Sequence, residues 1–370
     1  MAARETSASE HPAEDTSAGT TPATPTGFRD ELRDAVSLRT VLLVAGVLLV
    51  QIAFVASYVG AFHHPTPHDV AVGVVAPGSS QQQVIAKLDG AAGHPVSAEA
   101  VADRATALAR IKSADLAAAL VVDPNGKTDE LLVASGGGAS LVTAVEQFAQ
   151  HAEAQQGRSV RVTDVVPLQS GDARGLSGFY LVIGWLVGGY LVASLLGVAK
   201  GARPANPRRA AIRLGAVVPY AVLSGLGGAL IVDQWLGALT GGFWSLWGLG
   251  TLLVLSSATV TMAFQTLFGT IGIGITVLLF VVLGNPSAGG AYQYQLLPAF
   301  WRHVGGWIPN GAGTDAVRRI VYFAGHGIAG EVWLIVAYVV VGAVVTMAAA
   351  VRHARREGNR VAVPATASVD

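Results

Sequence analysis

The residues best suited to chemistry in this chain are three histidines that lie close together in the sequence. His63, His64 and His68 precede Asp69, and imidazole and carboxylate groups are common zinc ligands. A metal site also needs fixed geometry, whereas the prolines between these histidines favour an extended, solvated segment. We therefore expect a linker at this position rather than a metal site.

The tripeptide Gly126-Lys127-Thr128 has the sequence that ends a phosphate-binding loop. That loop also needs a glycine five residues before Gly126, where this chain has Val121, so we expect a turn between strands rather than a nucleotide site. The chain has no cysteine, which excludes thiol nucleophiles and Cys-ligated zinc. No paired carboxylates and no nucleophile–base spacing stand out. The sequence therefore predicts a protein that is not an enzyme, with no catalytic residues, metal or cofactor.

The elements around these motifs are mainly apolar. The chain is 52% hydrophobic and 13% charged, against about 25% charged in soluble domains. Because about 20 apolar residues of helix cross a bilayer, the apolar runs predict an α-helical polytopic membrane protein with six transmembrane helices, at 39–62, 176–199, 214–232, 243–264, 267–284 and 331–351. The first run is expected to be a retained anchor, since a long segment with several acidic residues precedes it.

Lysines and arginines near the predicted helix ends set the expected orientation. They cluster before the first helix, between the second and third, and after the last. Six crossings place all three clusters on one side, whereas one long helix over 243–284 would not, so a turn is expected near 265–269. We predict a multi-pass protein of the plasma membrane with both termini in the cytoplasm. Residues 1–38 would be a disordered tail with a juxtamembrane segment, and 352–370 a second tail.

Residues 63–175 are predicted to form an extracytoplasmic α/β domain inserted between the first two membrane helices. Apolar runs bounded by turn residues predict strands at 70–76, 116–122, 131–134 and 160–166, and a short one that begins at 95–96. Helices are expected at 79–88, from a cap at Ser97 through Ile111, and at 139–155.

The middle of each predicted span lacks Asp, Glu, Lys and Arg. Because intramembrane ionisable residues mark proton relays, their absence argues against a transporter driven by carboxylate protonation. Serine, threonine and tyrosine hydroxyls remain, and we expect them to form hydrogen bonds between helices rather than to line a path. A Gly184–Gly188 pair at G-x-x-x-G spacing predicts close packing of the second helix.

Two loops between the predicted membrane helices could have a functional role. The basic loop 199–213 fits two roles equally: an anchor for the topology, or a docking surface for a cytoplasmic ATPase formed by Lys200, Arg203, Arg208, Arg209 and Arg213. The external loop 285–330 has apolar stretches too short to cross a membrane. Amphipathic helices are expected at 296–307 and 314–323, the latter capped by Thr314 or Asp315. The loop fits either interfacial packing or an outer gate formed by Asn285, Pro286, Pro298, Trp301, Trp307, Pro309 and Arg318.

Several short motifs carry a resemblance to a known family. They are Asp172–Gly189, Gly284–Gly290, Leu297-Pro298, Ile308–Gly311 and Arg318–Phe323. With these motifs, the chain from Val41 to Arg356 resembles the YhgE/Pip (phage infection protein) branch of ABC-2-type permease-like membrane proteins. The resemblance implies an exporter-like domain of six helices, often a homodimer, with re-entrant helices before the last span. It also implies a separate ABC ATPase that docks on cytoplasmic loops.

Two functions follow as expectations. The first is the transmembrane subunit of an exporter that moves a lipid-like, peptide or drug-like molecule outward, powered by a separate ATPase. The alternative is a non-transporting envelope scaffold or surface receptor that acts through the extracytoplasmic domain. The lipid bilayer is the expected environment. The zero net charge indicates no nucleic-acid partner.

Overall fold

The computed structural model describes residue 27 and residues 37–361. The predicted tails therefore lie largely outside the described residues, except that helix α13 (Ala329–Val361) continues beyond the predicted end at residue 351. The chain divides into two compact units, 1–49 and 50–370. The first unit includes the start of helix α2 (Leu38–Phe62), where the Ser37 hydroxyl accepts a hydrogen bond from the Thr40 amide. This bond satisfies one of the free amides of the first turn.

Within the described residues, five helices are long and apolar enough to cross a membrane. They are α2, α6 (Ser177–Lys200), α7 (Pro207–Ala229) with its π-helical continuation η2 (Leu230–Trp235), α8 (Phe243–Phe268) and α13. The chain is thus a mostly helical integral membrane protein with a small α/β domain.

The fifth predicted span, at 267–284, differs from the other five. It is a run of α9 (Ile271–Val277), the π-helical η3 (Leu278–Leu283) and α10 (Gly284–Ser287). At 1.5 Å per residue these 17 residues extend about 25 Å, less than the hydrocarbon core of about 30 Å. The expected turn before this run is present, because α8 ends at Phe268 and Gly269 has a φ of +66°.

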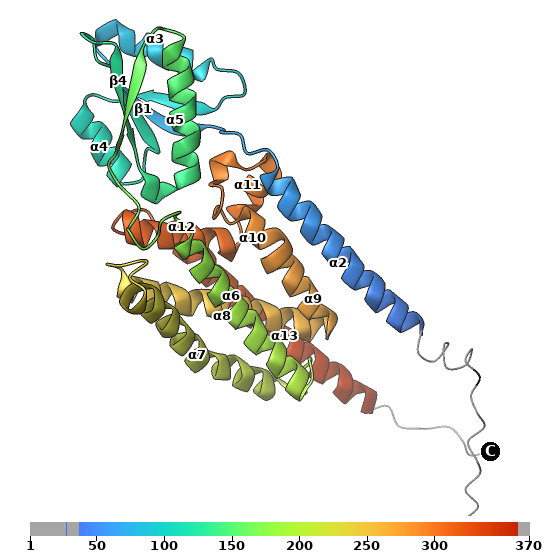
Figure 1. Ribbon diagram of the computed structural model, residues 1–370. Helices are drawn as coiled ribbons and strands as arrows, with labels where there is room; N and C mark the ends of the chain where they lie inside the picture. The colour runs from blue at the N-terminus through green and yellow to red at the C-terminus, as the bar shows by residue number, and fades with distance from the viewer. Residues whose placement is uncertain (1–26, 28–36, 362–370) are drawn as a thin grey trace, which may run out of the picture. The chain divides into compact units, whose positions relative to one another are not determined.

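Helix α8 lies at the centre of the helical bundle, among α6, α7 and α13 (Figure 1). Within its most apolar 18-residue window, 72% of the residues are buried, against 28–33% for those three neighbours. Small residues permit the close approach of α6 and α13 to α8. A Cβ atom at Gly189 of α6 would collide with the Val254 carbonyl of α8, and one at Gly342 of α13 would lie 2.6 Å from Thr259 Oγ1. By contrast, Gly184 of the predicted G-x-x-x-G pair has open space around it among the described residues.

Replacing Gly189 by alanine is therefore expected to destabilise the bundle by about 1–3 kcal/mol, the usual cost of overpacking. The matched control is Gly184→Ala, which should be neutral or slightly stabilising because alanine favours helix and fills open space. Thermal unfolding of the detergent-solubilised chain would compare the two variants. Equal melting temperatures would contradict the packing described for α6 against α8.

The serine and threonine hydroxyls in the bundle do not follow the prediction of bonds between helices, whereas the Tyr338 hydroxyl of α13 donates to the Trp307 carbonyl. Most donate to a carbonyl three or four residues earlier in their own helix, as in Ser256, Thr259, Thr261, Thr266, Thr276 and Thr346. The bonds between helices come instead from longer aromatic side chains: Trp185 Nε1 donates to the Ser224 carbonyl, and Trp247 Nε1 to the Val222 carbonyl. A short hydroxyl side chain reaches its own helix more easily than a neighbour.

The α/β domain contains a five-stranded sheet in the order β2-β1-β3-β4-β5. The strands are β1 (Val70–Val75), β2 (Val96–Ala100), β3 (Ala118–Val121), β4 (Thr128–Val133) and β5 (Ser159–Asp164). β1 is parallel to β2 and β3, and β4 is parallel to β5. β3 and β4 are antiparallel, so residues 122–127 form the predicted turn between strands.

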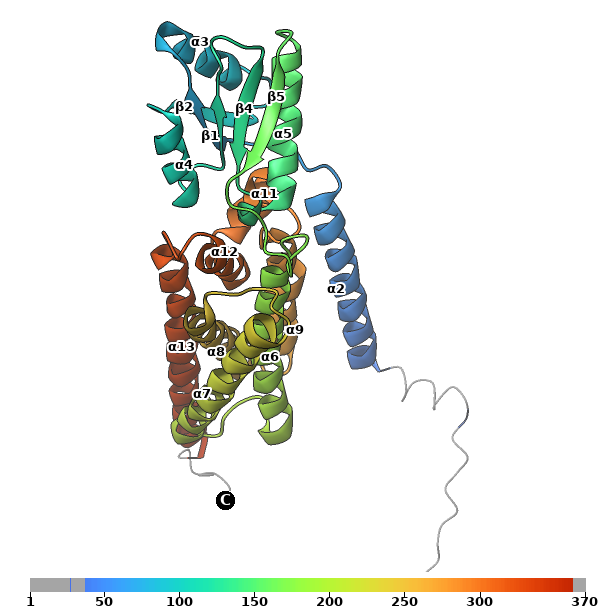
Figure 2. The ribbon, with the colours of Figure 1, turned by 60° about the vertical axis from the view of Figure 1, so that its left-hand side comes forward.

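Three helices cover this sheet. α3 (Gly78–Asp89) and α5 (Ala139–Ala154) share one apolar core with the sheet, and α4 (Arg104–Lys112) shares another on the opposite face (Figure 2). The predicted α/β fold is confirmed, but the helix expected from Ser97 is wrong. Residues 96–100 pair with β1, and α4 begins only at Arg104, where Asp103 accepts a hydrogen bond from the Thr106 amide at 2.7 Å. Pairing in the sheet outweighs the local capping signal of Ser97.

Candidate functional site

Two segments rich in arginine meet at one end of the helical bundle. Arg203 Nη2 donates to the Leu267 carbonyl at 3.2 Å, which joins the α6–α7 connection to the end of α8. The His353 ring of α13 lies 3.1 Å from the Thr266 carbonyl of the same helix end. We call this end, with Lys200–Arg213 and Arg352–Arg356, the basic end. The third cluster that the sequence predicted on this side precedes α2 and belongs to the other unit.

The five candidate docking residues of the basic end divide into two groups. Arg213 donates to the carbonyls of Lys200 and Gly201 at 2.7 and 2.9 Å, so together with Arg203 it satisfies carbonyls at the ends of helices. These two arginines hold the connection in place. The other three side chains, Lys200, Arg208 and Arg209, are exposed and lie at or near the helix ends.

Local capping explains why α7 begins where it does. Asn206 Oδ1 accepts a hydrogen bond from the Arg209 amide at 2.8 Å, and Pro207 occupies the first helical position. The first turn of α7 therefore presents Arg208 and Arg209 to solvent in a fixed helical geometry.

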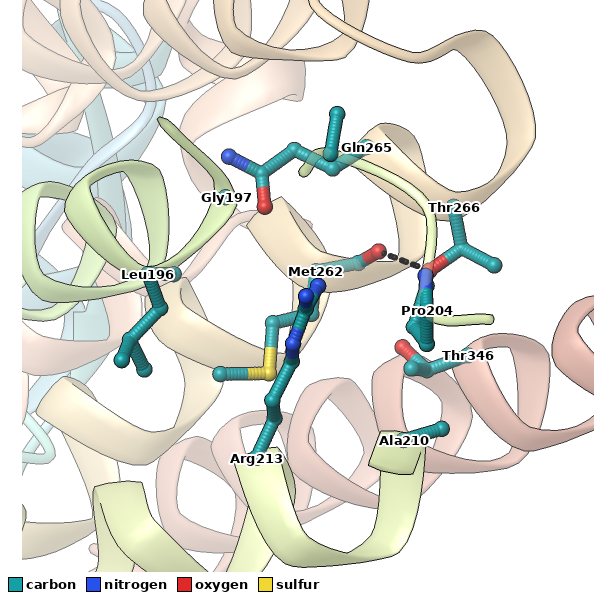
Figure 3. A pocket seen from close by; sticks show the side chains of 11 residues that line it. Leu196, Gly197, Pro204, Ala210, Arg213, Met262, Gln265, Thr266 and Thr346 are labelled. Atoms are coloured by element: carbon teal, nitrogen blue, oxygen red, sulfur yellow. Dashed lines mark hydrogen bonds between the residues drawn. The ribbon is translucent and has the colours of Figure 1, made fainter. Parts of the chain in front are cut away.

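A small cavity lies just inside the basic end (Figure 3). Its volume is about 10 Å³, room for about one water molecule. Gln265 of α8 lines it, is 1% exposed, and lies against Gly197 of α6, where a Cβ atom would be 2.6 Å from Gln265 Nε2. This Nε2 atom is without a hydrogen-bond partner among the described residues. The sequence analysis missed Gln265, although a glutamine inside an apolar run was a visible signal.

The opposite end of the bundle carries the predicted outer-gate residues. The segment 284–323 folds there as α10, η4 (Tyr294–Leu296), α11 (Ala299–Gly305) and α12 (Pro309–Tyr322), which we call the outer segment. α12 begins at Pro309, so the predicted caps Thr314 and Asp315 lie inside the helix. This expectation was wrong because Pro309 already supplies a first helical position with fixed φ. The Thr314 hydroxyl instead donates to the Asn310 carbonyl at 2.8 Å.

A buried amide holds the short helical run against α12. Asn310, 1% exposed, donates from Nδ2 to the Phe280 carbonyl at 2.9 Å and to Asn285 Oδ1 at 3.0 Å. The Phe280 carbonyl lies in the π-helical part of the run, where the ordinary helical hydrogen bonding is altered. Asn310 therefore pairs backbone and side-chain groups that would otherwise be buried unsatisfied.

The seven predicted gate residues fall into two groups. Asn285, Pro286, Pro309 and Arg318 belong to α10 and α12, which contact each other, and Arg318 Nη2 donates to the Gly289 carbonyl at 3.0 Å. The other three, Pro298, Trp301 and Trp307, lie in or beside α11. Trp301 Nε1 donates to Ser57 Oγ of α2 at 3.2 Å, and the Trp307 carbonyl accepts from Tyr338 of α13 at 2.9 Å, while the Trp307 side chain is exposed. Because α11 also contacts α10 and α12, the helices that carry the two groups adjoin one another.

A buried carboxylate that the sequence analysis did not single out ties α12 to α6. Asp172 is 3% exposed and accepts hydrogen bonds from the Tyr322 hydroxyl at 2.8 Å and from the Ser177 amide at 2.9 Å. Burial raises the pKa of Tyr322, and the Asp172 carboxylate raises it further. The signal in the sequence was an acidic residue just before an apolar helix, where the helix dipole favours negative charge.

Replacing Tyr322 by phenylalanine should lower the free energy of unfolding by about 1 kcal/mol, since it removes one hydrogen bond and leaves a buried carboxylate oxygen unpaired. Tyr180→Phe is the control, because the Tyr180 side chain of α6 is exposed. Thermal unfolding of the solubilised chain would measure both. A Tyr322→Phe variant as stable as the Tyr180→Phe variant would show that the bond to Asp172 is not formed.

The α/β domain is fastened to the outer segment rather than attached only by its ends. Gln293 Oε1 accepts a hydrogen bond from the Leu141 amide at 2.9 Å, and the Ser140 hydroxyl donates to the Ala291 carbonyl at 2.7 Å. Leu296 and Phe323 of the outer segment each belong to one of the two cores of the domain. The domain thus contacts the outer segment directly, including Phe323 at the end of α12.

The three histidines beside Asp69 lie in this connecting region. The His63 ring is 3.0 Å from the Val59 carbonyl, and the His68 ring is 3.0 Å from Thr66 Oγ1. The His68 amide donates to the Gln295 carbonyl at 2.8 Å, which joins the linker to the outer segment. Within the described residues, no group of three or more His, Asp and Glu side chains is placed to hold a metal ion.

The comparisons with known proteins add nothing to this geometry. No protein-family model, curated protein or solved structure matches the chain. What is established is therefore the class: an integral membrane protein with a mostly helical bundle, a basic end, and an α/β domain fastened to the outer segment.

Proposed function

We propose that the chain is the transmembrane subunit of an ABC-2-type exporter, similar to the YhgE/Pip branch, powered by a separate cytoplasmic ATPase. It lies in the plasma membrane with six crossings, with the basic end and both termini in the cytoplasm and the α/β domain outside. A homodimer would complete the transport unit.

The observation that carries this proposal is the arrangement of charge at the basic end. Arg203 and His353 bring two arginine-rich segments to the end of the same helix, α8. Among the described residues, seven exposed basic side chains there have no carboxylate within salt-bridge distance, namely Lys200, Arg203, Arg208, Arg209, Arg352, Arg355 and Arg356. Unpaired exposed charges of one sign complement an acidic partner surface and speed its association.

The outer segment supports the same proposal from the other end. The run 271–287 leads from the end of α8, at the basic end, to the outer segment at the opposite end of the bundle, and Asn310 fastens it to α12. Irregular helix at membrane depth is tolerated where protein covers it. The buried helix α12 that follows this run fits the re-entrant helices that the resemblance implies before the last of the six crossings.

Co-purification tests the proposal. The full chain, extracted in mild detergent, should co-purify with one ATP-binding subunit in stoichiometric amount. Deletion of the gene for this chain should reduce export of a specific compound. A stable, monodisperse protein without an ATP-binding partner, together with unchanged export, would refute the proposal.

The second candidate, a scaffold or surface receptor, is favoured by a different observation. The cavity at Gln265 and one between Asp172 and Arg318 each measure only about 10 Å³, room for about one water molecule and far below the size of a transported molecule. A receptor of this kind should lose its function when residues 68–170 are deleted and keep it when Arg208 and Arg209 are replaced by alanine. The exporter predicts that both changes are harmful.

A further inference from the structure

A cavity of about 200 Å³ lies between the α/β domain and the outer segment. One wall consists of residues 114–117, before β3, and of the start of α5. The other wall consists of Gln293–Gln295 and α12. Both walls are held in place around it, because the His68 amide donates to the Gln295 carbonyl and the Leu141 amide donates to Gln293 Oε1.

The wall from the α/β domain presents one carboxylate. Asp115 lines the cavity, is exposed, and accepts a hydrogen bond from the Ser113 hydroxyl at 2.6 Å. It has no basic side chain within salt-bridge distance among the described residues. The turn that holds it is tight: Ala114 has a φ of +62°, and the amides of Asp115 and Leu116 both donate to the Arg110 carbonyl. A non-glycine residue in this conformation is held there by its surroundings.

The wall from α12 presents the Asp315 carboxylate and two guanidinium groups with different roles. Arg319 is already paired, since it donates to Asp315 at 2.8 Å and to the His326 carbonyl at 3.1 Å. Arg318 makes one hydrogen bond, to the Gly289 carbonyl at 3.0 Å, and within the described part of the chain it has no carboxylate partner. A guanidinium has five N–H donors, so Arg318 keeps donors for an anionic group.

The remaining lining is mostly apolar, with Ala117, Leu141, Val142 and Phe323 among its side chains. The cavity therefore combines an apolar body with one unpaired negative and one unpaired positive group on different walls, as ligand sites with few oriented polar groups do. A purely anionic ligand would face Asp115, and a purely cationic ligand would face Arg318. A ligand with both charges complements both walls.

We propose that this cavity binds a small zwitterion, with its ammonium group on Asp115 and its carboxylate or phosphate group on Arg318. The volume suits a molecule of about dipeptide size or the headgroup of an ethanolamine phospholipid, two sources of the same chemistry. A ligand that bridges the walls would stabilise the contact between the α/β domain and α12. This site does not depend on transport or on an ATPase partner.

The test measures binding to the purified full chain by calorimetry with two probes. L-Alanyl-L-alanine is titrated into the chain in phosphatidylglycerol nanodiscs, and dihexanoyl phosphatidylethanolamine is titrated into the chain in detergent. We expect saturable binding of at least one probe, and the probe that binds identifies the source. N-acetyl-alanyl-alanine amide, which lacks both charges, should not bind.

Two variants decide the outcome. Asp115→Asn and Arg318→Gln should each weaken binding at least tenfold, whereas the controls Asp123→Asn, in the β3–β4 turn, and Arg302→Gln, in α11, should leave it unchanged. Asp115 is exposed, so its variant is expected to fold even if Arg318→Gln, which loses the bond to Gly289, does not. The proposal is overturned if neither probe binds, if the uncharged amide binds equally well, or if Asp115→Asn binds as tightly as the parent chain.

Discussion

Replacing Arg208 and Arg209 by glutamate is expected to remove the ATPase from the purified protein. Both side chains are exposed on the first turn of α7, which Asn206 and Pro207 fix in place, and neither caps a helix end as Arg203 and Arg213 do. The double change reverses two charges at the proposed contact. Juxtaposed like charges cost several kcal/mol, so co-purification should fall at least a hundredfold.

Two controls separate docking from topology. Arg161→Glu places a new negative charge on β5, where Arg161 is exposed, and should leave the ATPase bound. Arg208→Lys with Arg209→Lys keeps the positive charge and should retain the partner. If the glutamate variant is inserted with the same orientation as the parent chain and still binds the ATPase, the loop is a topology anchor only, and the docking role is wrong.

The second large effect concerns a pair of buried carboxyl groups in the α/β domain. Asp129 is 1% exposed and Glu153 is 4% exposed, and Arg158 lies between them. Arg158 Nε donates to Asp129 Oδ2 at 2.7 Å but is 3.5 Å from Glu153 Oε2, which has no hydrogen-bond partner among the described residues. One arginine thus serves two carboxyl groups and pairs mainly with Asp129.

The pKa values of the two groups move in opposite directions. Burial first and the neighbouring Asp129 second raise the pKa of Glu153 to about 7, against smaller opposing effects of Arg158 and of Lys87 from α3. Burial also raises the pKa of Asp129, but hydrogen bonds from Arg158 and from the Asp123 amide outweigh it and lower the pKa overall. Glu153 is therefore largely protonated in the folded domain in mildly acidic solution.

The domain should be less stable at pH 8 than at pH 5. A carboxyl group whose folded pKa lies above its unfolded value contributes stability that is fully present below the unfolded pKa and is lost as the pH rises through the folded pKa. For Glu153 this loss falls between about pH 4.5 and 7 and amounts to about 2–3 kcal/mol. Asp129 acts in the opposite sense, because its contribution is lost as the pH falls through its lowered pKa. The two together predict maximal stability in mildly acidic solution.

Pulse proteolysis of the full chain in urea would follow unfolding of residues 63–175 across this pH range. Glu153→Gln removes the ionisable group and should abolish the loss of stability between pH 5 and 8. Glu146→Gln, on the same helix, should keep the pH dependence of the parent chain. A parent domain that is equally stable at pH 5 and pH 8 would contradict the arrangement of the Asp129–Glu153 pair.

The α/β domain was largely predictable because its signals are local. Alternation of apolar strands with helical segments predicted the sheet and its β3–β4 turn, and only the start of the helix expected from Ser97 through Ile111 was wrong. The error has a physical cause, since the pairing of residues 96–100 with β1 depends on a contact distant in the sequence. The apolar runs also predicted the five long membrane helices, for which length and composition suffice.

The sites were less predictable because they depend on contacts between distant segments. From the sequence, the five basic residues of the 199–213 loop were predicted to act as one group. In the structure, Arg203 and Arg213 donate to carbonyls at helix ends, whereas the side chains of Lys200, Arg208 and Arg209 are exposed and make no such bond to the described residues. The seven gate residues likewise depend on contacts among three separate helices, α10, α11 and α12. Asn310 lies in the Ile308–Gly311 motif, but its pairing with a carbonyl 30 residues away could not be predicted from the sequence.

The central claim is that the basic end faces the cytoplasm and the α/β domain faces outward. The chain has no cysteine, so single-cysteine variants can be labelled on whole cells without background from the chain itself. A membrane-impermeant maleimide should label Asn125→Cys, in the exposed β3–β4 turn, and should label Ala205→Cys and Arg355→Cys, at the basic end, only after the cells are opened. Labelling of either basic-end variant in intact cells, with Asn125→Cys protected, would contradict the claim.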